Sequence, residues 1–338
     1  GYEALSSEDG HGKNVAIGHS AGSQATTGVA NVMIGGLAGD ALTTGSYNVA
    51  VGYEALTTED ANGKNVAIGA QALRAQNAGA EAYNVGIGYQ AGYAVTSGVE
   101  NVLIGGLAGD ALTTGESNVA IGHEALSTED ANGRNVAIGR RALKVQNAGA
   151  EAYNVAVGFE AGVAVTTSTE TTIVGGSAGD ALTTGAGNTA IGYRALSTED
   201  TGGGNTAIGR DALMTQDTGN DAYNTAVGYS AGRLVTTGAD NVFIGGGAGD
   251  AVTTSGRNVA IGREAFSTED DVGYVVAVGY QALRNQNASG NTYNVAIGYN
   301  AGEAVTTGIN NTIVGGLAGD ALTTGGNNTA IGKNALSS

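Results

Sequence analysis

Residues 14–18 read Asn-Val-Ala-Ile-Gly, and this pentad recurs with small changes along the whole chain. It begins at residues 14, 31, 48, 65 and 84, so three steps of 17 residues and one of 19 make a period of 70. The longer period holds from 14 to 84, 154, 224 and 294 without a slip. A chain that keeps such register is ordered, and its short period indicates stacked structural repeats.

The amino-acid composition excludes several classes of function. The 338 residues include 60 glycines but no proline, cysteine or tryptophan, and the formal net charge is −17. The lack of cysteine excludes disulfides, thiolate metal sites and cysteine nucleophiles. The acidic balance argues against nucleic acid and anionic lipid as partners. No apolar run approaches the roughly 18 residues of a membrane span, so we expect no membrane insertion in this segment.

The unit itself predicts a strand followed by a corner. Counting the pentad's first residue as position 1, position 5 is Gly and position 8 is Ala in all 19 units. Position 2 is Val or Thr and position 4 is Ile or Val, which is the two-residue alternation of a strand. Stacking such strands about 4.8 Å apart builds an all-β parallel β-solenoid. We therefore expect about 19 rungs of 17, 17, 17 and 19 residues.

Position 1 is Asn in 17 of the 19 units. Such a column fits the solenoid, because stacked side-chain amides can hydrogen-bond to one another along the axis. The chain begins within one unit and stops within another, without the polar caps that solenoids use. We expect residues 1–338 to be one continuous repeat domain, a segment of a longer fibrous protein.

Position 3 bears on assembly. It is Ala or Gly in three of every four units and bulky in the fourth, so both strand faces are apolar and both need cover. One reading covers the second face with another copy of the chain. The residues of that inferred subunit interface are Met33, Leu103, Ile173, Phe243 and Ile313. The other reading is a solenoid whose position 3 fills its own interior.

The pentads at 14–18 and 188–192 resemble the head repeat of YadA-like trimeric autotransporter adhesins. The phrase Gly-Tyr-x-Ala-Leu at 52–56 and 279–283 is similar to repeats of phage tail-fibre proteins. The resemblance implies a left-handed parallel β-roll assembled as a homotrimeric extracellular fibre, on a bacterial cell surface or a virion. The unit here is longer than in the adhesin family, and the family's Ser after Asn is missing.

The longer units suggest a ligand-binding site. Their two extra residues precede the next Asn, and insertions on one side of a solenoid often form its binding face. Each insertion ends in a tyrosine that could stack on the sugars of a cell-surface glycan, or could instead cap the apolar end of its loop. These candidate ligand-binding residues are Tyr83, Tyr153, Tyr223 and Tyr293.

Acidic residues also recur every 70 residues but do not indicate catalysis. Glu and Asp are adjacent at 59–60, 129–130, 199–200 and 269–270, and an Asp column runs through 40, 110, 180, 250 and 320. Carboxylate pairs can act as acid and base or bind calcium, but an active site is normally unique whereas these pairs repeat. We expect a solvated, repulsive surface, with no catalytic residue, metal or cofactor.

The sequence thus predicts a structural and adhesive protein, the repetitive shaft or head of an extracellular fibre that attaches to a cell-surface glycan or protein receptor. It is not expected to be an enzyme. Two alternatives stay open. One is a solenoid glycan-degrading enzyme of the tailspike type, and the other is an ice-binding solenoid, suggested by adjacent threonine pairs such as Thr43-Thr44.

Overall fold

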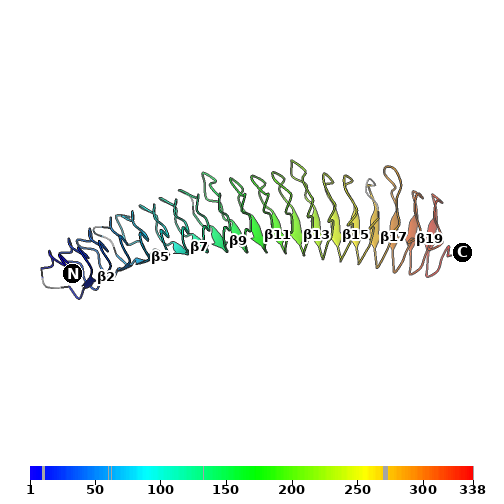
Figure 1. Ribbon diagram of the computed structural model, residues 1–338. Coiled ribbons are helices and arrows are strands. Elements are labelled where there is room, and N and C mark those ends of the chain that lie inside the picture. Colours follow the sequence, from blue (N-terminus) through cyan, green and yellow to red (C-terminus); the bar gives the residue numbers. More distant parts are fainter. Residues whose placement is uncertain (10–11, 60, 62, 132, 269–272, 338) are drawn as a thin grey trace. The chain divides into compact units, whose positions relative to one another are not determined.

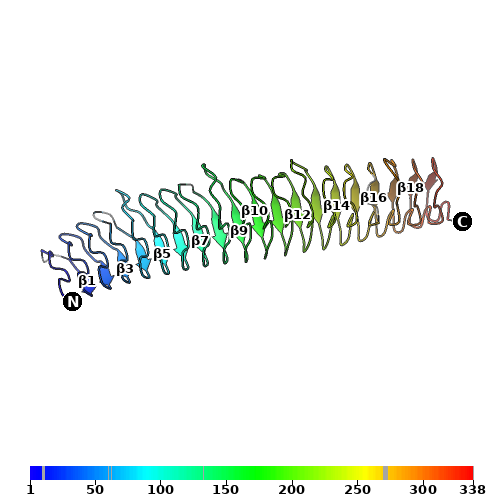
Figure 2. The same cartoon turned by 45° about the horizontal axis from the view of Figure 1, so that its top comes forward.

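The computed structural model describes residues 1–9, 12–59, 61, 63–131, 133–268 and 273–337 (Figure 1). It divides into two compact units, residues 1–170 and 171–338. Each unit is a run of similar turns, one strand to a turn (Figure 2). The predicted parallel β-solenoid is confirmed, and both units are built from the same turn.

Every strand has three residues, at positions 2 to 4 of its unit. The first compact unit contains β1 Val15–Ile17, β2 Val32–Ile34, β3 Val49–Val51, β4 Val66–Ile68, β5 Val85–Ile87, β6 Val102–Ile104, β7 Val119–Ile121, β8 Val136–Ile138 and β9 Val155–Val157. The second contains β10 Thr172–Val174, β11 Thr189–Ile191, β12 Thr206–Ile208, β13 Thr225–Val227, β14 Val242–Ile244, β15 Val259–Ile261, β16 Val276–Val278, β17 Val295–Ile297, β18 Thr312–Val314 and β19 Thr329–Ile331. Over the described ranges there is no helix that could cross a membrane.

Strands of successive turns pair in parallel with no shift of register. In β2 and β3, for example, Val32 lies opposite Val49 and Met33 opposite Ala50. The Val32 N–H donates to the carbonyl of Asn48 on the next turn (2.9 Å), and the Gly35 N–H donates to Ile17 on the previous turn (2.8 Å). Equal positions therefore stack on equal positions, which converts a sequence period into columns of side chains.

The glycine at position 5 makes the corner after each strand. Gly245 has a φ of +135°, and a Cβ on it would lie 2.5 Å from the carbonyl oxygen of Gly262 on the next turn. A left-handed backbone and a backbone atom in the place of a side chain both demand glycine. The neighbouring Gly246 has neither restriction, since the nearest atom to its added Cβ is 4.0 Å away.

The Asn column is a ladder, and backbone groups take part in it in addition to the expected side-chain amides. The backbone N–H of Asn48 donates to the side-chain oxygen of Asn31 (2.8 Å), and that of Asn118 donates to Asn101 (2.9 Å). The Asn31 side-chain N–H₂ donates to the carbonyl of Gly45, on the far side of its own turn (2.8 Å). Direct amide-to-amide bonds also occur, as between Asn101 and Asn84 (3.2 Å). The buried asparagines thus tie each turn to the next, and most of them, though not Asn65 and Asn135, also close their own turn.

The subunit interface inferred from position 3 is wrong. From β2 onward, position 3 of every strand is buried and positions 2 and 4 are at least partly exposed, as in β6, β7 and β14. The bulky position-3 side chains all lie inside the roll of this single chain, each with 0% exposure: Met33, Leu103, Ile173, Phe243 and Ile313. They cannot contact another copy. The reading in which position 3 fills its own interior is the correct one.

Small and large residues alternate in that interior. A Cβ on Gly249 would lie 2.4 Å from the ring of Phe243, and one on Gly232 would lie 2.8 Å from the same ring. Turns with glycine at position 9 therefore make room for a bulky position 3. Other turns reverse the arrangement, with buried Leu56 or Phe266 at position 9 and alanine at position 3. This exchange of volumes explains why the interior has a 70-residue period.

Candidate interaction surfaces

The outer face of the sheet is the main exposed apolar surface. Positions 2 and 4 point outward from every strand, and Ile68, Ile244 and Ile297 are more than a third exposed. Two further columns border these residues, at position 6 and at the residue before position 1. We call these four columns the outer face. In the described part of the chain, all the large exposed apolar residues lie in it except Ile309 and Leu336.

Aromatic and cationic side chains alternate along the two borders of the outer face. At position 6, the Arg210 guanidinium lies over the rings of Tyr193 (6.0 Å) and Tyr229 (5.8 Å), and Tyr280 stacks on Tyr299 (5.4 Å). Position 6 holds no Asp or Glu in any unit, although the chain carries 31 acidic residues. The position-6 border is therefore aromatic and free of acidic residues, whereas the other border also carries Glu100, Glu170 and Asp240.

The four tyrosines predicted to bind a ligand belong to the other border of the outer face. Their exposed fractions are 50% for Tyr83 and Tyr153, 61% for Tyr223 and 56% for Tyr293. In the first loop the neighbouring Ala82 is completely buried while the tyrosine is exposed. The loops at 146–153, 216–223 and 286–293 rise above those of neighbouring turns (Figure 1).

Neighbouring polar groups hold these tyrosines in place. Lys64 donates to the Tyr83 hydroxyl (3.0 Å) and lies 5.0 Å from the ring centroid, while the hydroxyl donates to Glu81 (2.7 Å). Arg134 donates to the Tyr153 hydroxyl in the same way (3.1 Å). The rings are exposed yet oriented, which suits a contact surface. Ligand binding at these residues stays a prediction.

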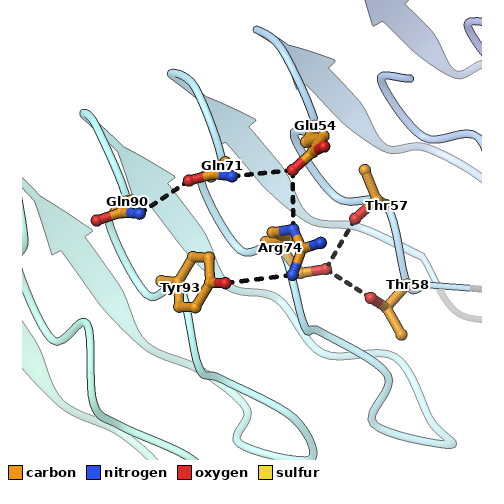
Figure 3. Close-up of polar contacts among 7 residues, drawn as sticks. All are labelled: Glu54, Thr57, Thr58, Gln71, Arg74, Gln90 and Tyr93. Carbon is orange, nitrogen blue, oxygen red and sulfur yellow. Dashed lines mark hydrogen bonds and ion pairs between the residues drawn. The ribbon is translucent and has the colours of Figure 1, made fainter. Parts of the chain in front are cut away.

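A second surface, the polar ladder, consists of positions 7 and 10 of successive turns. In Figure 3, Gln90 donates to Gln71 (2.8 Å) and Gln71 donates to Glu54 (2.9 Å). Arg74 bonds both Glu54 (3.0 Å) and the Tyr93 hydroxyl (3.2 Å). Side-chain hydrogen bonds to Gln71 and Tyr53 and the pairing with Arg74 lower the pKa of Glu54. Here the polar groups are bonded to one another.

The acidic turns are only partly the solvated surface that the sequence suggests, because Asp130 and Asp200 are exposed but the glutamate of each of these pairs is not. Glu59, Glu129 and Glu199 are completely buried. The Glu199 carboxylate accepts from the Gly202 N–H (2.7 Å) and from Gln216 on the next turn (3.0 Å), so it joins two turns. The counterparts Asp60, Glu269 and Asp270 lie outside the described residues.

One cluster of three acidic residues has oxygen atoms close enough together to hold a metal ion. Oxygens of Glu199, Asp200 and Asp217 lie within 4.8 Å of one another. Burial and the negative charges of Asp200 and Glu199 raise the pKa of Asp217. The Glu199 oxygens already accept hydrogen bonds from Gly202, Gln216 and Thr218. Since its oxygens are occupied, Glu199 acts here as a structural acceptor.

The Asp column is also less solvated than expected. Asp40, Asp110 and Asp250 are half-buried at position 10. Burial raises the pKa of each carboxyl, and a nearby glutamate on the next turn adds to the effect.

The polar ladder opens into a cleft in the second compact unit. This cleft of about 950 Å³ surrounds Gly246 and Gly247 and is lined by residues of five turns, among them Tyr229, Arg233 and Asp250. Position 7 is Gly247 here but leucine or serine at the matching places, residues 37, 107, 177 and 317. The sequence signal was the change of Gly-Gly-Leu-Ala-Gly to Gly-Gly-Gly-Ala-Gly at 245–249. The repeat keeps its register here but loses one side chain, and sequence reasoning missed the cleft that results.

Comparison with protein-family models, with curated proteins and with solved structures finds no match. The function of the chain is therefore inferred from its residues and their geometry.

Proposed function

We propose that this chain is a structural and adhesive element of an extracellular fibre, in which copies of the chain associate through the outer face. The resemblance to adhesin heads and tail fibres suggests three copies, a left-handed roll and a bacterial or viral surface. The observation that carries the proposal is the outer face itself. A regular, exposed apolar strip that repeats from turn to turn is a surface for association.

The corrected direction of the strand side chains supports this assignment. Because position 3 fills the interior, the residues left to cover are at positions 2 and 4, as in Val119 and Ile121 of β7. Equal positions stack in register, so the apolar strip repeats with each turn in each compact unit. A second copy carries the same strip and can match it turn by turn, as symmetric assemblies require.

The borders of the outer face also suit an interface. Aromatic residues and arginine are the side chains that protein interfaces favour, and both line the apolar strip. Arginines at position 6, such as Arg140 and Arg210, place positive charge where the contact would form. Such charge would offset part of the repulsion between two chains that each carry −17.

Sedimentation equilibrium tests the assembly. The chain has a mass of 33.0 kDa, and a species of three times that mass is expected. Replacing two neighbouring outer-face residues, Ile244→Glu with Ile261→Glu, places charges in the contact and should leave a folded monomer. A wild-type chain that is monomeric at all concentrations would sink the proposal.

A matched control adds the same charge elsewhere. Ala80→Glu with Ala150→Glu changes two exposed loop residues outside the outer face. This variant should sediment like the wild type, so that loss of assembly in the outer-face variant reports contact rather than net charge. Equal dissociation of both variants would contradict an apolar interface.

A further inference from the structure

We propose that the cleft at Gly247 binds a neutral saccharide. The proposal rests on the proposed adhesive function, for which it supplies a ligand class, and it concerns a cleft in the second compact unit. The cleft holds about 950 Å³, near the upper end of the roughly 300–1,000 Å³ typical of small-molecule sites. It can therefore take more than one sugar ring.

Two residues distinguish the cleft from the matching turns. Gly247 stands where Leu37, Leu107 and Leu317 stand, so this turn lacks a side chain that most of its counterparts carry. An added Cβ at Gly247 would meet only the side chains of Glu264 (3.7 Å) and Asp250 (3.9 Å), so the space beyond it is open. The second residue is Arg233, which stands where Tyr93 stands 140 residues earlier, at twice the 70-residue period.

Arg233 is a cation without a close partner. Among the described residues, no carboxylate lies within the 4.0 Å of an ion pair from its guanidinium, whereas Arg284 pairs with Glu264 (3.5 Å). Asp250 faces it at longer range, and their attraction opposes the effect of burial on the Asp250 pKa. Arg233 thus offers unused hydrogen-bond donors toward the cleft that it lines.

The formal charges of the lining cancel. Three arginines, at 233, 263 and 284, face three carboxylates, at 211, 250 and 264. An anion would meet the carboxylates and a cation the arginines, in a chain whose overall charge of −17 already repels anions. A neutral molecule rich in hydroxyl groups can use both sets, because each hydroxyl donates one hydrogen bond and accepts others.

An aromatic ring completes the site. Tyr229 lines the cleft with 60% of its surface exposed. Arg210 lies over the ring, 5.8 Å from its centroid, while the next turn has Gly246 at the same position and so no side chain there. A pyranose ring presents a face of C–H groups that can stack on such an apolar surface while its hydroxyls reach polar groups.

The test uses three uncharged trisaccharides, maltotriose, cellotriose and chitotriose, each titrated against the full chain by calorimetry and saturation-transfer NMR. At least one should bind, with one site per chain and a dissociation constant on the order of 1 mM. Gly247→Leu should weaken that binding at least tenfold. Absence of binding by all three sugars, or binding unchanged in Gly247→Leu, would overturn the proposal.

The substitutions used in this test place residues that already occur at matching positions of the chain, so the variants are expected to fold. Leucine is tolerated at this left-handed position, since Leu107 and Leu317 have φ of 59° and 57° against 66° for Gly247. Arg233→Tyr, the residue of the matching turn at Tyr93, should weaken binding several-fold while the circular dichroism stays that of the wild type. Sialyllactose against lactose tests the charge argument, because tighter binding of the anionic sugar would overturn neutrality.

The result of the sugar-binding test can be distinguished from the result of the assembly test. The cleft adjoins the outer face at position 6, where Tyr229, Gly246 and Arg263 lie, but Gly247 itself lies on the polar ladder. Gly247→Leu should therefore sediment like the wild type. Loss of sugar binding with unchanged assembly supports the cleft alone. Unchanged assembly with no sugar binding in the wild type sinks the cleft and leaves the fibre proposal standing.

Discussion

Single residues in this chain are constrained by the next turn as much as by their own turn. Gly245 must be glycine because the carbonyl of Gly262 occupies the place of a side chain. Asn101 holds the backbone N–H of Asn118. The buried Glu199 carboxylate accepts from Gln216 one turn later. An invariant residue within such a repeat therefore reports a contact along the axis.

Adjacent glycines allow a direct test of that constraint. Gly245→Ala should destabilise the chain by about 1–3 kcal/mol from the left-handed backbone alone, with a further cost from the contact with Gly262. Gly246→Ala should change the unfolding free energy by less than about 0.5 kcal/mol. Urea denaturation followed by circular dichroism measures both variants, and equal costs would contradict the close approach of the two turns.

The half-buried aspartates predict a pH effect of known sign. The folded-state pKa of Asp110 is raised by burial, so the folded chain binds the proton more tightly than the unfolded chain does. Its ionisation therefore costs stability as the pH rises through the folded pKa. Asp110→Asn should raise the melting temperature at pH 7, and the gain should shrink as the pH falls toward 4. A gain that grows on acidification would contradict the assigned shift.

At the scale of the element, each turn is a strand, a glycine corner and an inward anchor whose size complements that of its neighbours. The three-residue strand is too short to be stable alone, and its bonds go to the turns before and after it. The interior decides the order of turn types, because a large position 3 needs glycine at position 9. Stability is therefore a property of neighbouring turns.

Exchanging the large side chain at position 3 with the glycine at position 9 tests this packing. Phe243→Ala should cost about 3–5 kcal/mol by leaving a cavity, and Gly249→Leu should cost about 1–3 kcal/mol by crowding the Phe243 ring. The double variant Phe243→Ala with Gly249→Leu imitates the turns with leucine at position 9, such as that of Leu56. It should be clearly less destabilised than the sum, in a denaturant-based double-mutant cycle. Simple additivity would show that the two residues do not share the space.

At the scale of the whole molecule, one apolar strip and a large negative charge act in opposite directions. The outer face favours association, whereas 31 acidic residues against 14 basic ones oppose the approach of copies. The polar ladder, bonded to itself in Figure 3, keeps another side of the first compact unit polar. This contrast between sides suits a fibre that associates along one face and stays hydrated on another.

Salt should shift that balance. Raising NaCl from 50 to 500 mM shortens the screening length by about threefold and weakens the repulsion between like-charged copies. The concentration needed for assembly, measured by sedimentation, should therefore fall as salt rises. Assembly that weakens with salt would indicate an interface held by ion pairs at the borders instead of by the apolar strip.

The period, the strand at positions 2 to 4 and the glycine corner were all predictable from the sequence, because each repeats a local backbone demand. Alternation also predicted that the strand has two faces. It could not say which face is inside, since alanine at position 3 and isoleucine at position 4 are both apolar. Burial of Met33 and Phe243 settled that question, and it moved the candidate interface to the outer face.

By itself, then, the amino-acid sequence determined the stacked turn and its columns of side chains, because a period of 17, 17, 17 and 19 residues can be counted along the chain. Only the tertiary structure decided what those columns contact. The buried Glu199 carboxylate accepts a hydrogen bond from Gln216 on the next turn. The Gly247 cleft joins residues from Asp211 to Asn285. The Glu199 contact and the cleft both depend on distances between residues of different turns, and these distances cannot be read from the order of residues along the chain.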